Sequence, residues 1–241
     1  MAQEFIGIKR RVPYEGVIER VVIHNSDTRS LLIRIPGASE FSFAPGQFIS
    51  VIIPAGDKPI TRSYSLASSP EDGQPFEICL NLIDGGVGSN YLFSLKEGST
   101  LSFTGPFGVF TLNEPPQVET VFIAEGTAIA PIRPMLRRAI STPDHPPLSL
   151  IYTAPDGEHL LYRSEFEALA QRDPRFRFEP IITATGRLSA LLDDLERRYV
   201  KGDALRERHF YICGVGNDVL KLRDLLRGAG YPRRWVEYER W

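Results

Sequence analysis

The stretch TVFIAEGTAIAPIRPMLRRAIS, residues 120–141, decides what kind of fold this chain has. Its apolar run over 120–124 predicts a buried strand, and the Gly126–Thr127 pair that follows predicts a tight turn. Pro131 then suits the first turn of a helix, where a missing N–H leaves no partner unsatisfied. The stretch therefore predicts a strand, a turn and a helix in succession, which is the repeating unit of a parallel α/β domain.

The same alternation continues to the end of the chain. Three further apolar runs are each followed by a segment with amphipathic helical spacing; the runs cover 148–154, 178–184 and 209–216, and the helical segments cover 163–172, 188–200 and 218–230. Strands that alternate with amphipathic helices predict a parallel sheet covered by helices on both faces.

Upstream of this region the periodicity is different. Residues 5–112 contain short β-type runs separated by glycine and proline, at 16–25, 30–36, 47–54, 61–68, 76–83 and 100–106. This spacing predicts an antiparallel barrel or sandwich, with one short helix over 91–98. The pattern changes at NEPPQ, residues 113–117, so we expect a two-domain fold: an antiparallel β-barrel over 1–113 and an α/β parallel-sheet domain over 117–241.

Composition narrows the range of functions. A net charge of −2 provides no overall field for nucleic acid, and no apolar run is long enough for a signal peptide or a membrane span. We therefore expect a cytoplasmic protein that binds neither nucleic acid nor membrane. Two cysteines without a CxxC motif exclude a four-cysteine iron–sulfur cluster. We expect no metal site, and we place four scattered histidines in loops or on the surface: His24, His145, His159 and His209.

The run RSYSLAS, residues 62–68, carries the side chains that a flavin nucleotide needs. Arg62 and Tyr64 lie on one face of a strand. A guanidinium binds a pyrophosphate, an aromatic ring stacks on a planar heterocycle, and the hydroxyls of Ser63 and Ser65 can bond to ring nitrogens. An ordinary exposed strand is the alternative for these residues taken alone.

Two glycine-bearing turns offer anion sites. In GGVGSNYL, residues 85–92, the turn of Gly86, Gly88 and Ser89 precedes a helix, whose first N–H groups attract an anion. A capped hairpin is the alternative.

In the second half, a ligand is expected beyond the carboxyl ends of the parallel strands, where ligands bind in open parallel sheets. Gly126, Thr127 and Pro131 lie at one such end, and Cys213, Gly214 and Gly216 lie at another. Cys213 also suits a small buried position.

The chain ends in VEYERW, which places Glu239 and Trp241 two residues apart on one strand face. A large apolar ring at the end of the chain is expected to cover something, either a bound cofactor or the domain interface.

In this order the motifs resemble those of the ferredoxin–NADP(H) reductase family, and the resemblance extends over nearly the whole chain. In the first half, a barrel strand of the family is similar to FSFAPGQFISV (41–51), and its flavin signature is similar to RSYSLAS. The family's pyrophosphate turn is similar to GVGSNYL (86–92), and its barrel closure is similar to GPFG (105–108). In the second half, EGTAIAP (125–131) resembles the family's Gly-Thr-Gly-Ile-Ala-Pro turn, which binds the nicotinamide nucleotide. The stretch YICGVGND (211–218) resembles the family's Cys-Gly motif, and the ending ERW resembles the Glu-x-aromatic terminus of plant-type members.

The resemblance implies an FAD-dependent oxidoreductase whose barrel is a flavin domain and whose α/β domain binds NADP or NAD as co-substrate. It implies that hydride passes from nicotinamide C4 to flavin N5. The implied flavin contacts are Arg62 with the backbone of Gly88 and Ser89 at the pyrophosphate, Tyr64 stacked on the ring, and Ser65 near N5. It implies that Cys213 and Glu239 line the nicotinamide side of the site. It also implies that Trp241 shields the other face of the flavin and moves away for hydride transfer.

The electron acceptor is expected to be a separate protein such as ferredoxin or flavodoxin, because the chain has no cluster or haem motif. Four basic residues offer a docking patch, with scattered solvated charge as the alternative: Arg10, Arg11, Arg233 and Arg234. A reductase component of a multicomponent oxygenase is the rival enzyme. A non-catalytic flavin-binding subunit with a decayed nicotinamide site is the alternative outside enzymes.

Two residues of the nicotinamide-nucleotide turn and one later stretch bear on how closely the chain follows the family pattern. Ala128 stands where the family has glycine, and Glu125 brings a negative charge to a pyrophosphate turn. If position 128 needs a positive φ and Glu125 is exposed, the two together weaken coenzyme binding by roughly tenfold. The family's Ser-Arg pair that binds a 2′-phosphate is absent from IITATGR, residues 181–187. Arg187 could serve instead, and a preference for NADP depends on it; a solvated loop residue is the alternative.

Overall fold

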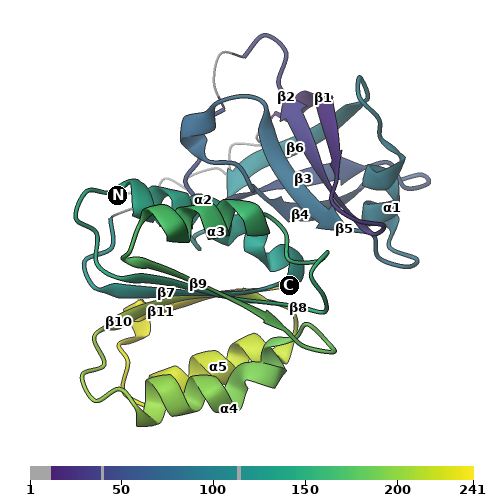
Figure 1. The fold of residues 1–241 in the computed structure, drawn as a ribbon. Helices are drawn as coiled ribbons and strands as arrows, with labels where there is room; N and C mark the ends of the chain where they lie inside the picture. The colour runs from purple at the N-terminus through teal and green to yellow at the C-terminus, as the bar shows by residue number, and fades with distance from the viewer. Residues whose placement is uncertain (1–11, 39–40, 113–114) are drawn as a thin grey trace, which may run out of the picture.

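The computed structural model describes residues 12–38, 41–112 and 115–241, and its strands form two sheets (Figure 1). The first sheet is antiparallel, in the order β4-β3-β6-β1-β2-β5. Its strands are β1 (Tyr14–Ile23), β2 (Thr28–Arg34), β3 (Phe48–Ile53), β4 (Ile60–Ser65), β5 (Phe76–Asn81) and β6 (Thr100–Phe107). A bridge between Leu66 and Ile78 joins the two outer strands, so the sheet closes into a barrel. The six predicted runs and the barrel are confirmed.

Alternation along the strands builds the core of the barrel. In β3, Ile49, Val51 and Ile53 are fully buried while the residues between them are partly exposed. This period of two is what a strand with one buried face requires. Phe76 and Phe103 fill the centre of the same core, with ring centroids 5.5 Å apart.

The helix of the barrel half lies earlier than we predicted. Helix α1 covers Val87–Ser94 and not 91–98. It begins directly after the glycine turn because the Asn90 side chain donates to the Gly86 carbonyl, 2.8 Å away, and the Ser89 hydroxyl bonds within the same turn. It ends before Gly98, whose φ of +85° belongs to a turn.

The second sheet is parallel, in the order β11-β10-β7-β8-β9. Its strands are β7 (Glu119–Glu125), β8 (Leu148–Ala154), β9 (Phe176–Ile182), β10 (Arg208–Gly214) and β11 (Val236–Arg240). Helices α2 (Ile129–Ser141) and α3 (Arg163–Arg172) cover the face nearer the barrel, and α4 (Leu192–Leu195) and α5 (Asn217–Gly228) cover the other (Figure 1). The predicted α/β domain is confirmed. Of the predicted boundaries, residues 1 and 113 lie outside the described residues.

The segment predicted as one helix over 188–200 is irregular. It consists of a 3-10 turn (Leu188–Leu191), the single turn of α4 and a π-helix (Glu196–Lys201). Side chains take the last carbonyl groups: Tyr231 donates to the Tyr199 oxygen at 2.9 Å, and Arg206 donates to the same oxygen at 2.8 Å. The sequence places Leu188, Leu191, Leu192 and Leu195 on one helical face, and three of them are buried while Leu192 is partly buried.

One histidine contradicts our expectation of loop or surface positions: His209 lies within β10, 3.0 Å from Glu237. His145 lies in the loop between α2 and β8, but it is buried, and its Nε2 lies 2.7 Å from Asp173. His24 and His159 lie in loops, as predicted. Within the described ranges, no group of three His, Cys, Asp or Glu side chains is placed to hold a metal ion.

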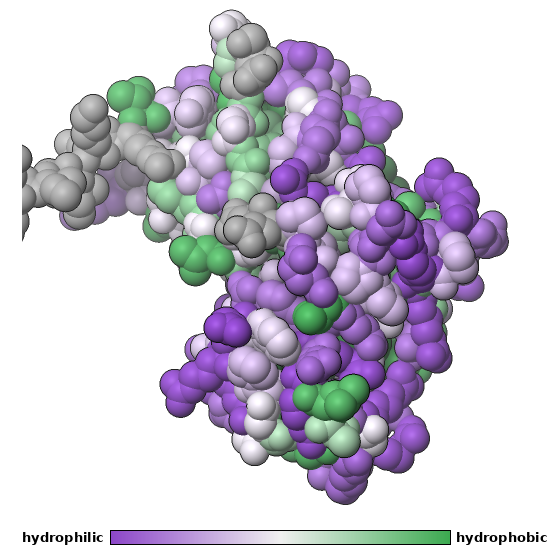
Figure 2. All heavy atoms as spheres, turned by 90° about the vertical axis from the view of Figure 1, so that its left-hand side faces the viewer, coloured by the Kyte–Doolittle hydropathy of each residue, from purple (hydrophilic) through white to green (hydrophobic). Residues whose placement is uncertain are grey.

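The surface of the α/β half is mostly polar on the face drawn in Figure 2, where apolar residues form small separate groups in its lower part. Exposed large apolar side chains, such as Val109, Ile182 and Leu205, are scattered along the chain. None of the helices within 12–38, 41–112 and 115–241 is long and apolar enough to cross a bilayer.

Candidate functional site

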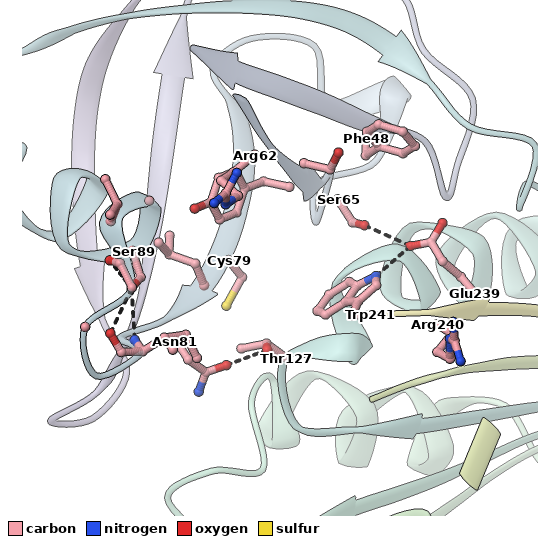
Figure 3. A pocket seen from close by; sticks show the side chains of 18 residues that line it. Phe48, Arg62, Ser65, Cys79, Asn81, Ser89, Thr127, Glu239, Arg240 and Trp241 are labelled. Carbon is pink, nitrogen blue, oxygen red and sulfur yellow. Dashed lines mark hydrogen bonds between the residues drawn. The ribbon is translucent and has the colours of Figure 1, made fainter. Parts of the chain in front are cut away.

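A cavity of about 680 Å³ opens between the barrel and the carboxyl-terminal edge of the parallel sheet (Figure 3). Its volume is in the range of ligand and cofactor pockets. Ten of the residues predicted from the sequence line it: Arg62, Ser63, Tyr64, Ser65, Gly86, Gly88, Ser89, Thr127, Glu239 and Trp241. The fold therefore brings the flavin-type motif, the glycine turn and the end of the chain together.

Strand β4 supplies the charged and aromatic part of the lining. Arg62 is exposed, and its single side-chain hydrogen bond within the described residues runs to the Thr61 carbonyl, at 2.8 Å. Its remaining donors are therefore free to bind an anion. Tyr64 is half-buried, and this burial raises the pKa of its phenol, which keeps the ring neutral.

The glycine turn fits a pyrophosphate closely. A Cβ on Gly88 would lie 2.9 Å from Arg62 Cγ and 2.9 Å from Tyr64 Oη, so only glycine lets α1 approach these side chains. Gly86 caps the helix without a side chain, which leaves the first N–H groups available to an anion. The Ser89 hydroxyl holds the turn through bonds to Ile83 N and the Gly86 carbonyl, at 3.0 and 3.1 Å. These residues fit the diphosphate of FAD.

The turn after β7 forms the opposite wall. The Thr127 hydroxyl donates to Asn81 of β5 and so joins the turn to the barrel. Gly126 has a φ of +53° and its carbonyl accepts from the Tyr152 hydroxyl at 2.9 Å, while Pro131 is buried in the first turn of α2. Neither Gly126 nor Pro131 lines the cavity.

The two residues that depart from the family pattern do not act as we expected. Ala128 has a φ of −65°, so its Cβ causes no strain; the positive φ belongs to Gly126. Glu125 is 4% exposed and is bound by Arg187, so its charge does not face the cavity as a free carboxylate. The expectation of strain and repulsion is wrong, and the structural reason for a decayed nicotinamide site disappears with it.

The end of the chain closes the cavity from the side of the sheet. Trp241 Nε1 donates to Glu239 Oε1 at 2.8 Å, and the Ser65 hydroxyl of the barrel donates to the same oxygen at 3.4 Å (Figure 3). The Trp241 backbone pairs with Gly214 and Gly216 at 3.0 and 3.1 Å. Burial raises the pKa of Glu239, and the two hydrogen bonds oppose that rise.

Cys213 lies beneath this end and does not line the cavity. It pairs in register with Glu239 and is fully buried. Burial, with the nearby carboxylates of Glu239 and Glu125, raises the pKa of the thiol well above its ordinary value. The side chain is therefore a neutral thiol beside Glu239 on the neighbouring strand. Gly214 and Gly216 likewise lie outside the lining.

Sequence reasoning missed several lining residues. Cys79 and Asn81 reach the cavity from β5, and Phe48 and Arg240 border it at β3 and β11. Leu80, Ile83, Gly85 and Val87 complete the lining. The sequence could have predicted Arg240 as a lining residue, because it lies between Glu239 and Trp241. Asn81 could not be predicted in this way, because only its hydrogen bond with Thr127, 46 positions later, places it at the cavity.

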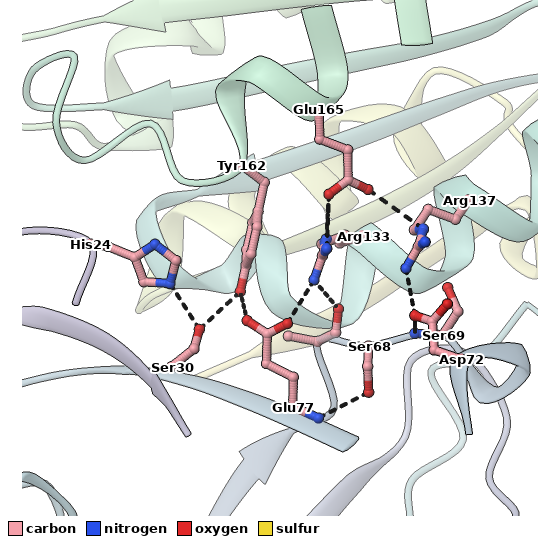
Figure 4. A network of polar contacts seen from close by, with 11 residues as sticks. His24, Ser30, Ser68, Ser69, Asp72, Glu77, Arg133, Arg137, Tyr162 and Glu165 are labelled. Atoms are coloured by element: carbon pink, nitrogen blue, oxygen red, sulfur yellow. Dashed lines mark hydrogen bonds and ion pairs between the residues drawn. The ribbon is translucent and has the colours of Figure 1, made fainter. Parts of the chain in front are cut away.

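The contact between the two halves continues beyond the cavity as a network of charges (Figure 4). Arg133 of α2 lies 2.9 Å from Glu77 of β5 and 2.8 Å from Glu165 of α3. The Tyr162 hydroxyl donates to Glu77 at 2.6 Å. Further along α2, Arg137 pairs with Asp72 at 2.6 Å. We call Arg133, Glu77, Glu165 and Tyr162 the interdomain clamp.

Known proteins share both halves of this architecture. The family model for the oxidoreductase FAD-binding domain matches residues 16–112, and the model for the oxidoreductase NAD-binding domain matches residues 122–218. Ferredoxin–NADP reductase B of Sorangium cellulosum is 31% identical over 238 residues, which cover 95% of this chain and 98% of that protein. The glycine betaine monooxygenase reductase subunit of Pseudomonas aeruginosa is 28% identical over 88% of this chain, which spans 60% of that protein.

Solved structures show the same fold. A ferredoxin NADP+ reductase from Neisseria gonorrhoeae with bound FAD and NADP superposes with a TM-score of 0.78 at 23% identity, over 96% of this chain and 99% of that one. A cytochrome P450 reductase from Amycolatopsis superposes with a TM-score of 0.81 at 23% identity, over 95% of this chain and 69% of that one.

Proposed function

The chain belongs to the ferredoxin–NADP reductase family of FAD- and NAD-binding oxidoreductases, and from this premise we propose that it moves electrons between NADH or NADPH and a separate acceptor protein. The observation that carries the proposal is the single cavity that holds the Arg62–Ser65 motif, the glycine turn, Thr127 and the Glu239–Trp241 ending. FAD supplies the conversion between hydride transfer and single-electron transfer.

The residues of the barrel hold and orient the cofactor in this proposal. Arg62 and the first N–H groups of α1, at Gly88 and Ser89, bind the diphosphate. Tyr64 packs against the planar ring, and Ser65 offers its hydroxyl near the reacting nitrogen. Gly86 and Ser63 complete the cradle, and the close approach of Gly88 to Arg62 brings the two sides of the diphosphate site together before the cofactor binds.

The residues of the α/β half receive the coenzyme. Gly126, Thr127 and Pro131 shape the turn that binds it, and Gly214 and Gly216 leave room for it beside β10. Cys213 lies beside Glu239 on the neighbouring strand, and Glu239 holds Trp241 over the cavity until the nicotinamide takes the place of the indole ring. The exclusion of water by Trp241 favours hydride transfer over side reactions.

The remaining proposals concern organisation and location. We place the domain boundary at residues 113–117, between the end of β6 at Phe107 and the start of β7 at Glu119. We place the protein in the cytoplasm, which agrees with two buried cysteines that are not paired with each other.

The acceptor in our proposal is a ferredoxin or flavodoxin that docks at the mouth of the cavity, beside Arg240 and the 43% exposed Trp241. Arg233 and Arg234 precede β11, whereas Trp241 follows it, so these two arginines lie about 16 Å or more from the cavity. They are poorly placed for a patch at the mouth. Arg10 and Arg11 lie outside the described residues.

Anaerobic mixing of the purified protein with NADH, and separately with NADPH, tests the proposal. We expect the absorbance of oxidised flavin to disappear with at least one coenzyme, and added ferredoxin or flavodoxin to restore it. A colourless protein that takes up no FAD on reconstitution contradicts flavin binding. Persistent oxidised absorbance with both coenzymes favours a non-catalytic flavin-binding subunit.

A second candidate is the reductase component of an oxygenase. It is favoured by the match of 88% of this chain to the monooxygenase reductase subunit, although the chain spans 60% of that protein. Delivery of electrons directly to an oxygenase, without an added ferredoxin, would distinguish it.

The assigned role of Arg62 has its own test. Arg62→Ala removes the free guanidinium of the diphosphate site and is expected to weaken FAD retention by about tenfold or more. Arg20→Ala, at another exposed arginine of the barrel, is the matched control. Equal FAD retention in both variants counts against the role of Arg62.

A further inference from the structure

Glu125, the last residue of β7, has a buried carboxylate that binds three donors from other segments. Its Oε1 accepts from Arg187 Nη1 at 2.9 Å and from Val215 N at 2.8 Å, and its Oε2 accepts from Leu188 N at 2.9 Å. The donors follow β9 and β10 in the chain. The carboxylate therefore ties together three loops at the carboxyl-terminal edge of the sheet.

This edge is where a nucleotide binds in an open parallel sheet. Two glycines provide the room that the contact needs. A Cβ on Gly214 would lie 3.1 Å from Glu125 Cγ, and a Cβ on Gly186 would lie 2.6 Å from the ring of Pro155. The loop that carries Arg187 therefore lies against the end of β8, in reach of Glu125.

Arg187 is the residue at this edge on which recognition of a 2′-phosphate would depend. Its side chain is 46% exposed, so a coenzyme can reach it. In dinucleotide-binding folds an arginine accommodates the 2′-phosphate of NADP, whereas the 2′-hydroxyl of NAD needs no positive charge. A carboxylate 2.9 Å from the guanidinium offsets much of the attraction that a dianionic phosphate would experience.

We propose that Glu125 determines coenzyme specificity by holding Arg187 in this ion pair, so that the protein binds NADH at least as tightly as NADPH. The inference rests on the proposed function and deepens it by naming the coenzyme and the residue that selects it. It reverses the preference for NADP that the sequence alone suggested from Arg187.

Two small nucleotides that differ only in the 2′-phosphate test the inference by titration calorimetry on the FAD-loaded protein. We expect 5′-AMP and adenosine 2′,5′-bisphosphate to bind the wild type with dissociation constants within about threefold of each other. Glu125→Gln keeps the size of the side chain and removes its charge. This variant is expected to bind the bisphosphate about tenfold more tightly, with binding of AMP unchanged. The double variant Glu125→Gln, Arg187→Gln is expected to lose that gain.

Arg187→Gln, with Glu125 intact, keeps the test decisive if Glu125→Gln does not fold. We expect this variant to change bisphosphate binding by less than about threefold. A wild type that binds the bisphosphate about a hundredfold more tightly than AMP, and loses this preference in Arg187→Gln, overturns the inference alone. If neither nucleotide binds and neither coenzyme reduces the flavin, the proposed function fails and the inference fails with it.

Discussion

The interdomain clamp and the end of the chain both connect the barrel to the α/β half, but they are built in opposite ways. Arg133 of the clamp is 14% exposed and bonds to Glu77, Glu165 and the Ala67 carbonyl. Trp241 is 43% exposed, and its side chain makes one hydrogen bond within the described residues. The clamp is therefore the fixed connection and the terminal tryptophan the movable one.

This difference assigns a separate task to each connection. Helix α2, which carries Arg133, begins directly after the coenzyme turn, and Glu77 lies two residues before Cys79 in the cavity wall. We therefore infer that the clamp holds the turn before α2, which binds the coenzyme in the proposed function, at a fixed distance from the cavity wall of the barrel. In the proposed function the cap at Trp241 controls access, and we infer that the site opens by displacement of this one ring without rotation of the two halves.

The largest expected effect comes from breaking the clamp. Arg133→Met leaves the nearly buried carboxylate of Glu77 without its cation, while Glu165 keeps only Arg137, 3.5 Å away; the loss costs about 3 kcal/mol of folding free energy. Urea denaturation measures the loss. Coenzyme binding should weaken as well, because the turn before α2 is no longer held at its distance from the barrel. A free energy of unfolding within about 1 kcal/mol of the wild type contradicts the fixed connection.

Removal of the cap should have a smaller effect on stability and an opposite effect on binding. Trp241→Ala exposes little new surface and is expected to cost about 1 kcal/mol. Because the indole ring no longer competes for the cavity, the coenzyme should bind up to about tenfold more tightly in titrations followed by flavin absorbance. Trp235→Ala, at the other end of β11, is the control. Unchanged coenzyme binding and turnover leave Trp241 with a packing role.

The contrast also shows what the sequence could predict. The strands of the barrel and the alternation in the α/β half follow from periodicities within short windows, and both were confirmed. The clamp joins Glu77 to Arg133, 56 positions later, and Glu125 finds Arg187 62 positions later. Such pairs depend on how the loops pack, so the sequence around Glu125 does not reveal that its carboxylate is buried and bound by Arg187.

The acidity of Glu239 sharpens the description of the cap. Burial raises its folded pKa above the ordinary value of 4.5, so the folded state favours the protonated carboxyl more than the unfolded state does. This contribution to stability is complete below the unfolded pKa and is lost as the pH rises through the folded pKa. We therefore expect Glu239→Gln to gain stability relative to the wild type between pH 4.5 and 7, in melting temperatures measured across that range. A difference that does not vary with pH contradicts this account.

The smallest effect is expected at Arg138, which lies on α2 just beyond the interdomain clamp. Arg138 of α2 pairs with Glu71 at 2.9 Å, yet both side chains are well exposed, at 40% and 57%. An exposed pair gains little because water and salt screen it, so Arg138→Gln should change the free energy of unfolding by no more than about 0.5 kcal/mol. Coenzyme binding should not change, because Arg138 is one residue beyond Arg137 and makes no contact with the carboxylates that hold Arg133. If this variant weakens coenzyme binding as much as Arg133→Met does, the whole charged face of α2 positions the coenzyme turn, and the distinction between a buried clamp and its exposed margin fails.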